Sequence, residues 1–174
     1  MMEFASLADL AQHLVTRNAV LDLSIEQGVE LASIILQKEM KAEIGHYQDA
    51  IGPFPEWAEL AESTKEDRLT KGYSENDPLL RSGGLYNSIE CEANGGEAIA
   101  GSTSDIMPLH EFGTEKMPPR PVVGPALYRR IDEIVALIGK VSVSGLIGSD
   151  TIHSSLGYDM DRDGAPQYPT MPGL

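Results

Sequence analysis

The sequence is poor in cysteine and lacks long apolar runs, and each absence excludes a class of protein. Its single cysteine, Cys91, excludes an internal disulfide, and the flanking Glu90 and Glu92 disfavour a reactive thiolate. We therefore expect Cys91 to be a small core residue. No apolar run approaches the roughly 18 to 20 residues that cross a bilayer. The opening MMEFASLADL lacks the basic start and long apolar centre of a secretory signal. These absences predict a soluble protein made in the cytoplasm.

Aromatic and basic residues are also scarce. Aromatic residues make up 6% of the chain against 41% hydrophobic residues in total, which predicts an aliphatic core in a single domain. The 13 basic and 27 acidic side chains give a net charge of −14, so a phosphate-binding nucleic-acid surface is not expected. Residues 1–80 alone carry 6 basic and 15 acidic side chains. Residues 113–130 instead have a surplus of basic side chains. This surplus indicates either a positively charged surface that docks on an acidic partner or an ordinary solvated helix end.

Three helices are predicted. Residues 6–17 and residues 20–44 each place apolar side chains on one face, and the second segment would be about 37 Å long. Such a helix exceeds what a small sheet can cover, so one end should project or meet a neighbour. Gly45 would end it. A last helix is expected over residues 125–139, with Pro125 in its first turn. Its predicted inward-facing side chains are Leu127, Ile131, Ile134, Val135 and Ile138.

The predicted fold is α+β. Residues 46–80 form a polar loop with at most a short helix, pinned to the body by Phe54 and Trp57. Residues 89–94 alternate apolar and polar side chains and lead through Asn94-Gly95-Gly96 into a return strand over 97–102. Residues 107–112 are a candidate third strand. The long N-terminal helix and the C-terminal helix should pack on this small, mainly antiparallel sheet, over about residues 86–113.

Motifs for catalysis fail on their spacing. His110-Glu111 lacks the second histidine of a zinc-protease helix, because Thr114 occupies that position. Gly139-Lys140 lacks the upstream glycine and the following hydroxyl residue of a phosphate-binding loop. No spacing of serine, histidine and acid selects a triad. The residues therefore predict a protein that is not an enzyme and has no cofactor.

One pattern near the C-terminus is compatible with a cation site. Asp159, Asp161 and Asp163 match the first half of a calcium loop, but Thr170 stands where the loop needs a bidentate glutamate. Solvated charges are the interpretation we adopt, and the alternative of a weak calcium or magnesium site stays open. No metal ligands are therefore assigned.

Two segments carry a specific resemblance. PLLRSGGLYNSI (78–89) and MPLHEFGTEKMPPRPVVGPAL (107–127) resemble the bacteriophage virion-morphogenesis proteins, the tail-completion and neck proteins that join heads to tails. FPEWAELAEST (54–64) resembles the tryptophan-bearing loop of that family, and the resemblance spans about residues 20–140. This chain has valine at 122 and 123, where the family usually has an aromatic residue. The matched positions are Leu80, Arg81, Ser82, Gly83, Leu85, Ser88, Ile89, His110, Glu111, Phe112, Gly113, Thr114, Met117, Pro118, Arg120, Pro121, Pro125, Ala126 and Leu127.

The resemblance implies a structural protein that completes or terminates the tail and joins it to the head at the neck. It implies a homo-oligomeric ring of six copies in the virion, assembled in the host cytoplasm. The ring would contact a head-closure or adaptor protein and the tail-tube protein, with DNA passing through and no membrane contact. Proline-stiffened residues suit a fixed docking surface, because little entropy is lost when they are held against a partner. The predicted interaction residues are Arg81, Phe112, Gly113, Thr114, Met117, Pro118, Arg120, Pro121, Arg129 and Arg130.

Subunit pairing is expected to be electrostatic. Six copies that each carry a net charge of −14 repel one another unless opposite charges pair locally. The candidates for this pairing are Arg120, Arg129 and Arg130, which would face the acidic first eighty residues of a neighbouring copy. Reversal of Arg129 and Arg130 to glutamate is accordingly predicted to leave the monomer folded and to abolish joining.

Two alternative functions stay open. A head-side connector or adaptor would have twelve copies. A virion-associated cell-wall hydrolase would use Glu56, Glu59 or Glu111 as its acid or base.

The domain division follows the periodicity. Residues 1–140 form one domain, and residues 141–174 lack a helical stripe and read as an extended arm. Such an arm would order against a neighbouring subunit or neck protein, since it cannot bury enough surface alone.

Overall fold

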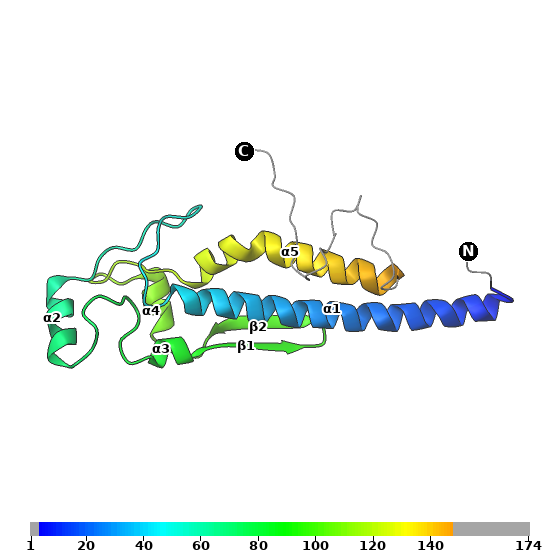
Figure 1. Ribbon diagram of the computed structural model, residues 1–174, viewed down its shortest axis with the longest axis horizontal. Helices are drawn as coiled ribbons and strands as arrows, with labels where there is room; N and C mark the ends of the chain where they lie inside the picture. Colours follow the sequence, from blue (N-terminus) through cyan, green and yellow to red (C-terminus); the bar gives the residue numbers. More distant parts are fainter. Residues whose placement is uncertain (1–3, 148–174) are drawn as a thin grey trace, which may run out of the picture.

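Two long helices and a β-hairpin make up most of the computed structural model, which describes residues 4–147 (Figure 1). Helix α1 lies in the middle, with α5 along one side and the hairpin along the other. The α+β class predicted from the sequence is confirmed. In chain order the elements are α1 (Leu7–Glu43), α2 (Glu62–Thr70), α3 (Gly84–Asn87), β1 (Ile89–Asn94), β2 (Glu97–Ser102), α4 (Met107–Phe112) and α5 (Val123–Ile147).

Helix α1 is one continuous element of 37 residues, about 55 Å long. Ser6 caps it by accepting a hydrogen bond from the Asp9 backbone N–H at 3.1 Å. The predicted break between residues 17 and 20 was wrong. Asn18 there donates to the Asp22 carboxylate one turn along, at 3.0 Å, instead of capping a new helix. Gly45, at φ +94°, follows the helix end as predicted, and the N-terminal end of α1 projects beyond the end of α5 (Figure 1).

The hairpin has the predicted strands and turn. Strands β1 and β2 pair antiparallel from Ile89 opposite Ser102 to Asn94 opposite Glu97. Gly95 and Gly96 take positive φ at the turn. The Gln37 amide of α1 donates to the Ile89 carbonyl at 3.0 Å, which ties β1 to the middle of the long helix.

Residues 107–112 form helix α4, so the prediction of a third strand was wrong. Pro108 lies in its first turn, where the missing N–H costs nothing. The apolar spacing of this short segment fits both a strand and a helix. In the structure Met107 points into the core, while Leu109 and Phe112 are exposed. Within residues 4–147 the sheet has two strands.

Helix α5 is longer than the sequence indicates and faces another way. It begins at Val123 and runs to Ile147, so residues 141–147 of the predicted arm are helical, and residues 148–174 lie outside the described residues. Three of the predicted inward side chains are exposed, and only Ile134 and Ile138 are partly buried. The prediction was wrong because Ala126 and Arg129 face α1 instead. The exposed three are Leu127, Ile131 and Val135.

The core lies at the C-terminal end of α1, where the loops and short helices converge. Trp57 pins the 46–80 loop there as predicted, and α2 is the one helix in that loop. Among residues 4–147 no helix is long and apolar enough to span a membrane. The buried apolar residues of this core cluster are Met40, Ile44, Trp57, Leu85, Ile89, Met107, Val122 and Ala126.

Candidate interaction surface

The residues after α4 form a tight turn that bears part of the predicted interaction surface. The Thr114 N–H donates to the Met117 carbonyl at 2.9 Å, and the Met117 N–H donates back at 3.2 Å. Residues 112–119 line a shallow open depression along this turn. Phe112 stands at its edge with 81% of its surface exposed. An aromatic side chain this exposed on a hydrogen-bonded turn is available as an anchor for a partner.

Gly113 is required by both its conformation and its surroundings. Its φ is +73°, and an added Cβ would lie 2.8 Å from the Pro119 nitrogen and 2.9 Å from the Met117 oxygen. Gly72 has nearly the same φ, +75°, but open space around it. A side chain added at Gly72 therefore has only the conformational cost, whereas one added at Gly113 has the conformational and the steric cost together.

Gly113→Ala should lower the free energy of unfolding by about 2 to 3 kcal/mol, because conformational strain and backbone contact act together. Gly72→Ala should cost only about 1 kcal/mol, the conformational part alone. Urea unfolding followed by circular dichroism measures both. Equal losses would show that the turn relaxes around the new methyl group.

Glu111 closes the N-terminus of α5. Its carboxylate accepts hydrogen bonds from the backbone N–H groups of Val122 at 2.7 Å, Val123 at 3.2 Å and Gly124 at 3.3 Å. These N–H groups belong to the helix start, which has no partner within the helix and favours a negative charge. Glu111 thus joins α4 to α5 across eleven residues of chain. No local spacing in the sequence reveals this contact.

Trp57 and Arg120 join the 46–80 loop to the proline-rich segment. The Arg120 guanidinium donates to the Ala58 carbonyl at 2.8 and 3.2 Å and to the Glu59 carbonyl at 3.1 Å. The Trp57 indole donates to the Pro121 carbonyl at 3.1 Å. Arg120 and Pro121 are both buried. They hold the surface in place from within the chain, which corrects the expectation that they contact a partner.

His110 is a half-buried neighbour of this contact. Its backbone carbonyl accepts the Arg120 N–H at 2.7 Å, and its Nδ1 is buried without a hydrogen-bond partner among residues 4–147. Burial lowers the pKa of His110, and the Arg120 charge lowers it further. The residue is therefore a neutral part of the scaffold at neutral pH.

Arg129 and Arg130 pair with acids of the same chain. Arg129 donates to the buried carboxylate of Glu43 and, at 2.9 Å, to the Gln48 side chain. Arg130 binds Glu39 at 2.7 Å. In the structure both arginines pair with acids of the N-terminal part of the same chain, and the pairing expected between subunits stays a prediction. Reversal of both to glutamate should therefore also destabilise the fold, which differs from the folded monomer expected from the sequence.

Arg81 directly follows the 46–80 loop and lies beside α2. It forms an ion pair with Asp67 at 2.7 Å and stacks over the Tyr73 ring at 5.2 Å. The neighbouring Arg68 is buried and donates to the Ser74 carbonyl at 2.7 Å. Sequence reasoning missed Arg68, because a lone arginine in a polar helix gives no signal of burial.

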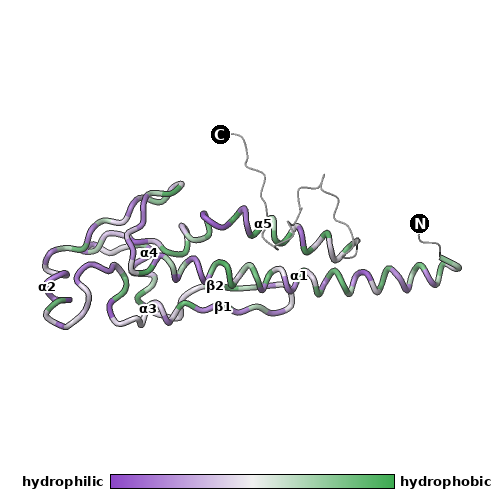
Figure 2. Tube along the Cα trace, viewed as in Figure 1, coloured by the Kyte–Doolittle hydropathy of each residue, from purple (hydrophilic) through white to green (hydrophobic). Residues whose placement is uncertain are grey.

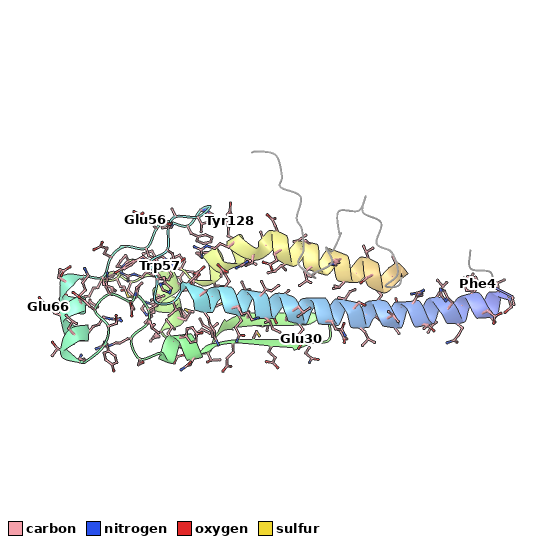
Figure 3. All side chains as sticks on the ribbon, in the orientation of Figure 1. Phe4, Glu30, Glu56, Trp57, Glu66 and Tyr128 are labelled. Atoms are coloured by element: carbon pink, nitrogen blue, oxygen red, sulfur yellow. The ribbon has the colours of Figure 1, made fainter. Side chains whose placement is uncertain are left out.

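The predicted interaction residues thus divide into a scaffold and a surface. Figure 3 shows Trp57 among the crowded side chains at the α2 and α4 end, while Phe4 lies at the far tip of α1. Gly113 and Met117, in the turn after α4, are half-buried. The predicted residues that remain exposed are Arg81, Phe112, Thr114, Pro118 and Arg130.

The three candidate acids of a hydrolase have different surroundings. Glu111 is engaged by three backbone amides, and the Glu59 side chain is exposed beside Lys65 at 3.7 Å. Glu56 is exposed on the loop (Figure 3). No group of three metal-ligating side chains occurs within residues 4–147. The candidate cation ligands at 159, 161 and 163 lie outside the described residues.

No protein-family model matches the chain, and comparisons with curated proteins and with solved structures find no significant match.

Proposed function

We propose that this chain is a structural, non-enzymatic protein of a tailed-bacteriophage virion, acting at the neck as a subunit of a ring of six copies. It would complete or terminate the tail and join it to the head. The resemblance of residues 78–89 and 107–127 to virion-morphogenesis proteins supports this proposal.

One observation carries the proposal: an exposed aromatic anchor stands on a segment whose backbone is held at several points. Phe112 is exposed, while Gly113, Arg120 and Glu111 each restrain the chain next to it. A rigid surface loses little entropy on docking, which suits permanent assembly. A catalytic lid, by contrast, needs to move.

The proposal is tested in the phage or prophage that carries the gene. Loss of the gene should yield filled heads and finished tails that do not join. Restoring the wild-type gene should restore infectious particles, and reconstruction of those particles should place six copies at the neck. Twelve copies on the head side would favour the adaptor. Normal joining without the gene would refute the structural role.

The exposed anchor gives a sharper test. Phe112→Asp should lower the yield of infectious particles at least about tenfold, because aromatic anchors commonly contribute about 2 kcal/mol or more to an interface. Ile99→Asp is the matched control, since Ile99 on β2 is similarly exposed but lies on the hairpin. Equal titres for the two variants would contradict the assignment of the surface to residues 112–119.

A further inference from the structure

Close contacts at Gly28 and Leu21 show which side of α1 faces α5. A Cβ added to Gly28 would lie 2.4 Å from Val141, and one added to Gly145 would lie 3.0 Å from the Leu21 backbone. The two helices therefore run antiparallel, and α5 ends at Ile147, two residues after Gly145. The first fourteen residues of α1 extend about 21 Å beyond the contact at Leu21 (Figure 1).

Three leucines at this end of α1 lie on the side that faces α5 further along. Leu7, Leu10 and Leu14 share that side with Leu21, because helical residues three, four or seven apart lie on one face. Leu7 is 85% exposed, Leu14 is 58% exposed and Leu10 is half-buried. Within residues 4–147 no other helix or strand lies beside them, and Figure 2 shows hydrophobic residues recurring along this end of α1. We call Leu7, Leu10 and Leu14 the α1 stripe.

The chain leaves α5 beside the α1 stripe and heads along it. Residues 148–174 follow Ile147 and lie outside the described residues. To pass the stripe as far as Leu7, the chain must cover about 21 Å, which takes about 14 residues in a helix or about seven when extended. The 27 residues that follow Ile147 are enough for either path.

The first part of this segment carries the apolar side chains that such a contact needs. Four large apolar residues lie within the first thirteen positions after α5: Ile152, Leu156, Tyr158 and Met160. Removing these side chains and the exposed leucines of α1 from water is favourable for both. The segment is too short and too polar to bury them within itself, so a surface outside the segment has to provide the contact.

Charge also fits a contact between this segment and the end of α1. Arg17 lies seven residues after Leu10 and four before Leu21, so it shares the side of the α1 stripe. Among residues 4–147 no carboxylate forms an ion pair with Arg17. Asp9, the other formal charge of residues 4–21, lies about 100° around the helix from Leu10. Residues 148–174 carry four aspartates and one arginine, so the acidic segment meets a basic side chain on the stripe.

We propose that residues 148–160 fold back on the α1 stripe of the same chain, with Ile152 and Leu156 packed against Leu10 and Leu14. The part of the predicted arm that the structure describes, residues 141–147, already packs on α1 of its own chain. A tethered segment also has an effective concentration in roughly the millimolar range, whereas a second copy must overcome the repulsion between two net charges of −14. The contact differs from the arm expected from the sequence, which orders against a neighbour. It does not depend on the proposed function.

Crosslinking within the full-length chain tests this contact. In a Cys91→Ser background, Ser155→Cys is combined with Leu14→Cys in one protein and with Val15→Cys in a second. Leu14 and Val15 are adjacent aliphatic residues, 58% and 66% exposed. Val15 lies about 100° further around α1, away from the side that faces α5. The pair therefore compares two sides of the helix at the same distance from the end of α5.

Both proteins are treated with a short bis-maleimide at low concentration, and the monomeric product is digested with trypsin. The crosslink joins the peptide of residues 1–17 to the peptide of residues 141–162, which mass spectrometry detects. We expect it to form at least about tenfold faster from Leu14→Cys than from Val15→Cys, because a docked segment holds position 155 on one side of the helix.

Two further pairs of substitutions in the Leu14→Cys protein establish which residues make the contact. Ile152→Asp with Leu156→Asp should lower the crosslinking rate to that of the Val15→Cys protein, because it places two charges in an apolar contact. Gln167→Asp with Thr170→Asp adds the same charge beyond residue 160 and should leave the rate unchanged. Circular dichroism checks that each variant keeps its helical content.

The contrary outcomes are distinct. Equal rates from Leu14→Cys and Val15→Cys would show that the segment does not select the α1 stripe, and the proposal would be dropped. A protein with Leu14→Cys alone is also mixed with an affinity-tagged protein that carries Ser155→Cys alone. Heterodimers that form as fast as the crosslink within one chain would overturn the proposal in favour of an arm on a neighbouring copy. Because every step uses the purified chain, normal particle assembly without the gene would refute the proposed function and leave this contact standing.

Discussion

Replacing Trp57 with alanine should lower the free energy of unfolding by about 4 kcal/mol, the cost typical of removing a large buried aromatic side chain. Trp57 is 4% exposed, belongs to the main core and donates to the Pro121 carbonyl. Its removal leaves a cavity between the 46–80 loop and the proline-rich segment. The same change should loosen the backbone that carries Phe112. Infectivity should fall together with stability.

Trp57→Phe separates packing from the hydrogen bond. Phenylalanine keeps most of the buried ring but loses the donor, so the expected loss is about 1 to 2 kcal/mol. Trp57 is the only tryptophan, so urea unfolding is best followed by circular dichroism instead of fluorescence. A Trp57→Ala variant within 1 kcal/mol of wild type would mean that Arg120 alone anchors the loop.

Stability should fall as the pH rises from about 5 to about 8, because of Glu43. This carboxyl is almost fully buried between α1 and α5, and burial raises its pKa from 4.5 to about 8. Arg129 on α5 opposes the rise in pKa, while Glu39 on α1 and Glu111 on α4 add to it. One oxygen of Glu43 has no hydrogen-bond partner among the described residues.

The sign follows from proton binding in the two states. Below pH 4.5 the carboxyl is protonated in both, and its contribution to stability is fully present. As the pH rises, the unfolded chain releases the proton while the folded protein keeps it, so stability falls until the pH passes about 8. The shift from 4.5 to about 8 limits the loss to about 5 kcal/mol, at about 1.4 kcal/mol per pH unit.

Glu43→Gln should remove this pH dependence. The variant should match wild type at pH 5 and be more stable by several kcal/mol at pH 8, since the amide needs no proton to be buried neutral. Glu26→Gln, an exposed change on the same helix, should leave the wild-type profile intact. Chemical denaturation across the pH range measures both. Parallel profiles for wild type and Glu43→Gln would mean that Glu43 is ionised throughout, paired with Arg129.

Much of the candidate surface could be located from the sequence, but the roles of its residues could not be separated. Gly113 and Pro118 mark a turn because their backbone preferences are local. Phe112 and Arg120 look equally available in the sequence, yet one is exposed and the other is buried against the Ala58 carbonyl. That difference depends on a loop more than fifty residues away in the chain.

The sequence by itself determined the elements whose cause is local. The hairpin follows from alternating residues around Asn94-Gly95-Gly96, and the long helix ends at Gly45 because glycine takes a positive φ. Tertiary structure decided what has no local cause. Residues 107–112 became helical because Met107 enters the core and Glu111 reaches the start of α5. Helix α5 turned Ala126 and Arg129 inward because burial depends on the partner that packs against a helix, and periodicity alone does not specify that partner.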